Sequence, residues 1–145
     1  MYKNILIPTD GSDEAEKASK HGVQLASEIG ANITALYVVR SRVTGVPSDV
    51  MKQVDDIDEW KEYGEEITQN VLDIAAEHDV SGKTAVTSGK PYQEIVDYAD
   101  ENDIDAIVMG TQGRDGIGDL LLGNVTERVV RSANVPVITV RQPKL

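Results

Sequence analysis

The sequence predicts a single doubly wound α/β domain, in which helices cover both faces of a five-stranded parallel sheet. Its 145 residues suit one domain. Short apolar runs alternate with segments of helical spacing from one end of the chain to the other. Most of these runs are continuously apolar, as expected of strands buried on both faces. Strands that are joined through helices make right-handed crossovers, which produce a parallel sheet.

The first half of the chain contains two expected strands with a helix between them. Residues 5–7 form a short apolar strand that ends in a turn. Ser12 is a suitable N-cap for the helix that follows, and Gly30 is expected to end it. A second apolar strand is expected over 33–39, followed by a polar loop over 40–47.

The second half begins with a long amphipathic helix, expected over 48–79 from the spacing of its apolar residues. Gly64 is a candidate for an interruption of this helix. Trp60 and Tyr63 lie beside the apolar stripe and are expected to be partly buried by packing. The remaining elements are expected at 83–88 (strand), 91–102 (helix), 104–109 (strand), a helix that includes Val125, Val129 and Val130, and 136–140 (strand). Pro136 marks the last of these as an edge strand or a strand start.

Composition excludes several classes of function. The formal net charge is −11, so the chain repels phosphate backbones and anionic lipid, and neither nucleic acid nor a membrane is an expected partner. General solubility accounts for this acidity, and adaptation to a salty cytoplasm is the alternative. The chain has no cysteine, which excludes disulfides and thiol chemistry, and only two distant histidines. Without a signal peptide or a long apolar run, the protein is expected to be cytoplasmic.

Two patterns resemble ligand-binding motifs but lack residues that those motifs require. Residues 82–84 read Gly-Lys-Thr, like the end of a phosphate-binding P-loop, but Glu77 stands where the motif requires its first glycine. The segment also leads into a strand, whereas a P-loop opens a helix. The acidic cluster over 55–59 lacks the glycine turn of a calcium loop, so a solvated helix face is favoured.

The segment after the fourth strand has the residue types that bind phosphate. Gly110 stands at the strand end, where a side chain would obstruct an approaching ligand. The glycines over 113–118 can turn successive N–H groups inward, and Arg114 adds a cation. Gly123 and Asn124 stand at the start of the last helix, whose free amides and dipole attract anions. The alternative is a glycine-rich crossover that binds nothing.

In four segments, 5–12, 107–114, 121–129 and 135–140, the sequence resembles the universal stress proteins. The ATP-binding branch of that family carries Gly-x2-Gly-x9-Gly followed by Ser or Thr. Gly110, Gly113 and Gly123 match this spacing, and Asn124 departs from it. The expected strand order is 3-2-1-4-5.

The resemblance implies a site for ATP, ADP or AMP, with or without Mg²⁺, at the carboxyl ends of the strands. It places Val38 against adenine, Asp10 near the ribose or a metal ion, and 110–116 with 124–126 around the phosphates. For Asp10, turn formation or helix capping is the alternative. The expected binding residues are Pro8, Thr9, Asp10, Val38, Met109, Gly110, Thr111, Gly113, Arg114, Gly116, Gly123, Asn124, Val125 and Thr126.

The function that the resemblance implies is that of an adenine-nucleotide-binding stress or regulatory protein, assembled as a homodimer through Val137–Val140. No catalytic residue is assigned, because the glycine loop contains no lysine and no evident base for water. Three alternatives stay open: an interaction dimer whose site is degenerate at Asn124, a weak Mg²⁺-dependent ATPase or adenylyl-transfer enzyme that uses Asp10, and flavin binding. The short turn after the first strand argues against a flavin.

Overall fold

The computed structural model describes residues 2–40, 54–111 and 123–141. The expected loop over 40–47 and the start of the expected helix at residue 48 fall almost entirely outside these ranges. Within them, no helix is long and apolar enough to cross a membrane.

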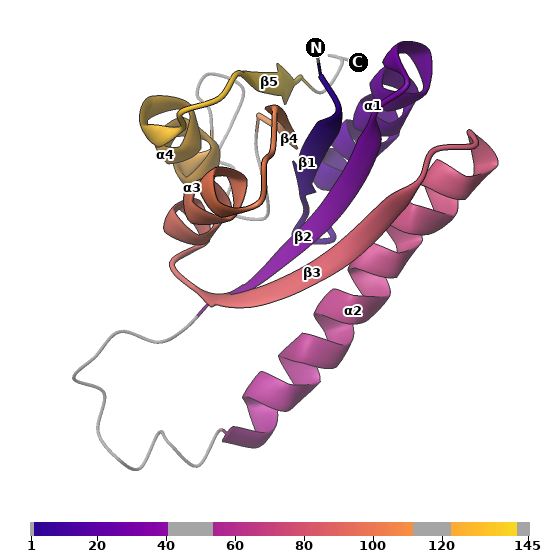
Figure 1. The fold of residues 1–145 in the computed structure, drawn as a ribbon. Coiled ribbons are helices and arrows are strands. Elements are labelled where there is room, and N and C mark those ends of the chain that lie inside the picture. Colours follow the sequence, from indigo (N-terminus) through magenta and orange to yellow (C-terminus); the bar gives the residue numbers. More distant parts are fainter. Residues whose placement is uncertain (1, 41–53, 112–122, 142–145) are drawn as a thin grey trace.

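The sheet has the predicted strand order, β3-β2-β1-β4-β5, and every neighbouring pair is parallel (Figure 1). β1 lies at its centre, with Ile5 paired to Ile33 of β2 on one side and to Ala106 of β4 on the other. β5 is an edge strand, as Pro136 suggested, although Pro136 itself precedes the strand. The strands are β1 (Asn4–Pro8), β2 (Asn32–Arg40), β3 (Gly82–Gly89), β4 (Ala106–Gly110) and β5 (Val137–Val140).

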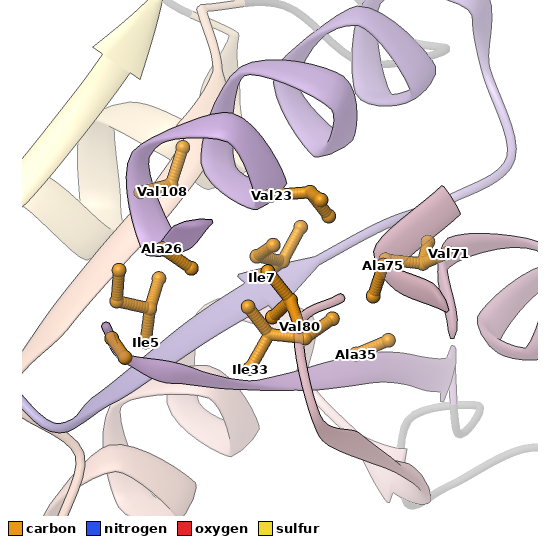
Figure 2. Packing of buried hydrophobic residues seen from close by; sticks show 11 residues of the cluster. Ile5, Ile7, Val23, Ala26, Ile33, Ala35, Val71, Ala75, Val80 and Val108 are labelled. Atoms are coloured by element: carbon orange, nitrogen blue, oxygen red, sulfur yellow. The ribbon is translucent and has the colours of Figure 1, made fainter. Parts of the chain in front are cut away.

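Two helices cover each face of the sheet. α1 (Asp13–Ile29) and α2 (Val54–Glu77) pack on one face, and α3 (Pro91–Glu101) and α4 (Asn124–Ser132) pack on the other (Figure 1). Because successive strand residues point to opposite faces, Ile5 and Ile7 lie under α1 while Leu6 lies under α3 and α4. Burial on both faces explains why the strand sequences are continuously apolar. Figure 2 shows the α1/α2 side, where Ile7 lies beside Val23 and Ile5 beside Ala26.

The predicted ends of α1 are confirmed. The Ser12 hydroxyl oxygen accepts a hydrogen bond from the N–H of Ala15 at 3.2 Å, and Gly30 adopts the left-handed conformation with φ of 73°. The expected start of the fourth strand is wrong by two residues. Ile104 donates its N–H to the carbonyl oxygen of Ala99 at the end of α3, so pairing with β1 begins only at Ala106.

Gly64 does not interrupt α2; it allows α2 to approach β2 closely. A Cβ atom at this buried position would lie 2.5 Å from Cδ2 of Tyr37. The ring of Tyr63 packs edge-on against Tyr37, with centroids 5.8 Å apart, and also against Trp60, which is 44% exposed. The expected partial burial is therefore confirmed for Tyr63, which is half-buried, whereas Trp60 is exposed.

The substitution Gly64→Ala tests this contact. It should lower the free energy of unfolding by up to about 2 kcal/mol, because overpacking against Tyr37 costs about 1–3 kcal/mol and outweighs the roughly 1 kcal/mol gain in helix propensity. Urea unfolding followed by circular dichroism measures the change. Glu65→Ala, at the exposed neighbouring position, should stay within about 0.5 kcal/mol of the parent. Equal or higher stability for Gly64→Ala would show that the ring moves aside freely.

Candidate functional site

The site predicted from the sequence lies at the point where the winding of the sheet reverses. The chain leaves β1 toward β2 on one side, and β4 flanks β1 on the other side. In sheets of this kind, ligands bind outside the carboxyl ends of the strands at this reversal. Pro8 and Gly110, the last residues of β1 and β4, are both buried there, as is Met109.

The turn after β1 is held by side-chain oxygens. The N–H of Thr9 donates to the carbonyl oxygen of Leu36 at 2.9 Å, and its hydroxyl oxygen accepts from the N–H of Gly11 at 3.2 Å. A carboxylate oxygen of Asp10 accepts from the N–H of Ser12 at 2.9 Å. Asp10 therefore shapes the turn into α1, the structural role considered for it above. In the described ranges, no three His, Cys, Asp or Glu side chains gather as a metal site.

Two hydrogen bonds hold the start of α4 against the end of β4, and a third joins the residue after β4 to β5. The hydroxyl of Thr126, which is 3% exposed, donates to the carbonyl oxygen of Gly110 at 2.8 Å. The N–H of Thr111 donates to the carbonyl oxygen of Val140 at 3.1 Å, and the carbonyl oxygen of Thr111 accepts from the N–H of Gly123. Both ends of the predicted phosphate segment are thereby brought to one place. The predicted residues Gly113, Arg114 and Gly116 lie outside the described residues.

The first turn of α4 has the donors that an anion needs. Gly123 is the N-cap and makes no side-chain cap, since it has no side chain. The N–H groups of residues 124–126 have no acceptor within the helix, because the first intrahelical bond runs from Glu127 to the carbonyl oxygen of Gly123. Asn124 is exposed and Val125 is half-buried. The hydroxyl proton of Thr126 is already used in its bond to Gly110, which leaves its backbone N–H for a ligand.

A cavity of about 220 Å³ opens beside this turn, and sequence reasoning missed most of its lining. Val125 and Asn124 line it, and both were predicted. Three basic residues, Arg40, Lys90 and Arg128, were not predicted; they come from the end of β2, the start of α3 and the middle of α4. No sequence signal links them, since they lie far apart in the chain. We call this cavity, lined by Arg40, Lys90, Pro91, Tyr92, Asn124, Val125 and Arg128, the basic pocket.

Val38 stands two residues before Arg40 on β2 and is half-buried. Its side chain packs in the cluster under α3 and α4, on the same face of the sheet as Tyr92, which lines the basic pocket. The expected base contact and the basic pocket are therefore on one side of the molecule. Asp10, in contrast, leads into α1 on the opposite face.

Asp105 lies at the other edge of the sheet, away from this site. Its carboxylate accepts hydrogen bonds from the N–H groups of Lys3 at 2.7 Å and Asn4 at 2.9 Å. These two bonds hold the pKa of the Asp105 carboxyl below its ordinary value. The carboxylate therefore ties down the amino end of β1.

The fold defines the protein as a doubly wound α/β protein, in which the start of α4 lies at the switch point without a side-chain cap. The sequence pattern of the universal stress protein family matches residues 1–141, and the chain belongs to this family. Universal stress protein MJ0531 of Methanocaldococcus jannaschii is 42% identical over 146 residues, which span 99% of this chain and 85% of that relative.

Solved structures share the fold. Protein MJ0577, also from Methanocaldococcus jannaschii, superposes with a TM-score of 0.87 at 30% identity, covering 100% of this chain and 99% of its own. The universal stress protein of Archaeoglobus fulgidus, solved in complex with dAMP, gives a TM-score of 0.67 at 24% identity over 95% of this chain and 97% of its own. At that identity the likeness concerns the fold alone.

Thr126→Val tests the anchor of α4. The substitution keeps the side-chain shape but removes the donor to Gly110, and should cost about 1–2 kcal/mol of unfolding free energy in urea titrations. Thr68→Val is the matched control. The hydroxyl of Thr68 is also buried, but it bonds to carbonyl oxygens of its own helix, so its loss should be nearly neutral. Equal effects for the two variants would contradict a special role for the bond to Gly110.

Proposed function

We propose that this chain binds an adenine nucleotide, ATP, ADP or AMP, across the carboxyl ends of β1, β2 and β4. The observation that carries this proposal is the uncapped first turn of α4, held against β4 by the bond from Thr126 to Gly110. A helix start of this kind offers aligned N–H groups and a positive dipole end to phosphate. Support for the adenine base comes from the family and from the Archaeoglobus fulgidus relative, which holds dAMP on the same fold.

Phosphate is attracted here although the whole chain is acidic. Backbone N–H groups supply positive partial charge regardless of the side chains around them, so a chain of net charge −11 can still bind a polyanion locally. The side chain of Asn124 is exposed at the first position of α4 and carries two amide donors. It replaces the hydroxyl that the ATP-binding pattern has at this position. We therefore infer that Asn124 contacts a phosphate oxygen through its amide.

The remaining assignments rest on the family resemblance and on position. Val38 would meet the base through its backbone at the end of β2, and Pro8, Thr9 and Asp10 would border the ribose. A Mg²⁺ ion would arrive with the phosphates, and Asp10 is the carboxylate at the end of β1 that would meet it. The residues 110–116 would enclose the phosphates.

The protein is further proposed to act as a regulatory homodimer that pairs through β5. β5 is hydrogen-bonded to β4 on one side, and within the described residues no strand pairs with its other side. Ile138 on this strand is 36% exposed, and an uncovered apolar edge strand favours pairing with a second copy. The role would be ATP-dependent association or signalling.

The substitution Asn124→Asp tests phosphate binding without disturbing the fold. An acidic residue in the first turn of a helix interacts favourably with the helix dipole, so thermal stability should be unchanged or slightly raised. The new carboxylate repels phosphate and removes two donors, so the affinity for ATP, measured by calorimetry with and without Mg²⁺, should fall about tenfold or more. Asn124→Ser, which restores the family hydroxyl, should keep ATP binding. Undiminished affinity in Asn124→Asp would place the phosphates elsewhere.

Ile138→Lys tests the dimer. A lysine on the β5 edge should raise the dimer dissociation constant at least about tenfold, because it introduces two like charges across the paired strands. Sedimentation velocity over a range of concentrations gives this constant. Ile29→Lys, the same substitution at a side chain that is 43% exposed at the end of α1, should leave the dimer intact. A monomeric parent protein, or an unchanged dimer in Ile138→Lys, would refute pairing through β5.

A further inference from the structure

The basic pocket gathers three cations that belong to three different elements. Arg40 ends β2, Lys90 is the N-cap of α3, and Arg128 lies in α4. We propose that the basic pocket is a binding site for phosphate-class anions, in which these three side chains are the charged ligands. The residues that the family resemblance assigns to the nucleotide include Asn124 and Val125 from this pocket but none of its cations. The basic pocket therefore adjoins the proposed nucleotide site and shares Asn124 and Val125 with it, and the new element of the proposal is the role of the three cations.

A cluster of positively charged side chains in a protein of net negative charge favours the binding of an anion. The chain has 14 basic residues against 25 acidic ones, so a cluster of basic residues is not expected from composition. In the part of the chain that the structure describes, neither Lys90 nor Arg128 forms an ion pair with a carboxylate. The guanidinium of Arg128 instead lies over the ring of Tyr92, 5.1 Å from its centroid. This stacking holds the charge at the pocket wall without neutralising it.

The acidic side chains nearest in sequence are directed elsewhere. Glu127, the neighbour of Arg128, pairs with Arg131 at 3.0 Å. Glu94, in the first turn of α3, packs its side chain against Gly89. Neither lines the pocket. The described residues that line the pocket therefore include three cations and no carboxylate.

The starts of two helices add to the positive electrostatic potential of the pocket. Lys90, Pro91 and Tyr92 form the beginning of α3, and Asn124 and Val125 form the beginning of α4; all five line the pocket. Neither N-cap residue makes a side-chain cap, so the N–H groups of the first turns are not used by the caps. Both positive dipole ends therefore point toward the anion that the cations attract.

The size of the pocket selects a compact ligand. Its volume of about 220 Å³ is below the roughly 300–1,000 Å³ typical of sites that enclose a drug-sized molecule. It suits one or two phosphoryl groups better than a complete nucleotide. Inorganic pyrophosphate and the phosphates of a nucleotide share this chemistry.

Calorimetric titration of the intact protein with inorganic pyrophosphate, at constant ionic strength, tests the proposal. The parent protein should bind pyrophosphate, and Lys90→Gln and Arg128→Gln should each weaken binding about fivefold or more, whereas Arg128→Lys should retain most of it. Lys83→Gln is the matched control, since it makes the same change of charge at an exposed position at the other end of β3. Absence of pyrophosphate binding, or an equal loss in Lys83→Gln, would overturn the proposal.

A second titration, with AMP in the presence of saturating pyrophosphate, distinguishes the two sources of phosphate. Competition would show that the pocket takes the phosphate of the nucleotide, and simultaneous binding would show that it takes a free inorganic anion; both outcomes support an anion site. Pyrophosphate binding without any binding of AMP, ADP or ATP would refute the proposed nucleotide function and leave the anion site standing. If instead no pyrophosphate binds and nucleotide binding is unaffected in both glutamine variants, the anion site is refuted and the proposed nucleotide function stands.

Discussion

Burial of both faces of the sheet is the constraint on which the site depends. α1 and α2 cover one face and α3 and α4 cover the other, so a polar ligand can approach only at the ends of the strands. Each helix runs back antiparallel to the strands, which places helix starts at the carboxyl edge. Unpaired N–H groups and positive dipole ends therefore collect at that edge. The bond from Thr126 to Gly110 brings the start of α4 to the same place.

The distribution of charge follows the same geometry. The chain as a whole repels anions, since its net charge is −11. At the carboxyl edge, however, the start of α4 adjoins Arg40, Lys90 and Arg128 of the basic pocket. At the opposite edge, the carboxylate of Asp105 accepts N–H groups from β1 and the residue before it. The three cations of the basic pocket and the carboxylate of Asp105 therefore lie at opposite edges of the sheet.

Local sequence patterns predicted the fold because the forces behind them act over short distances. Ser12 caps and Gly30 ends α1 through bonds within one helical turn, and both were predicted. Two of the wrong expectations concern a contact between residues distant in the chain and the start of a strand. Gly64 looked like a helix breaker, but contact with Tyr37 of β2 explains it. Ile104 has the apolar character of a strand residue, yet its N–H bonds to α3.

By itself, the sequence determined the order of the helices and strands, the α/β class and the segments at the carboxyl edge, because periodicity and turn chemistry are properties of neighbouring residues. Only the tertiary structure decided which side chains meet at that edge. It commits the hydroxyl of Thr126 to Gly110 and brings Arg40, Lys90 and Arg128 around one cavity. These contacts join residues far apart in the chain, whose proximity depends on strand register and helix packing. Neither is visible in a local pattern of residue types.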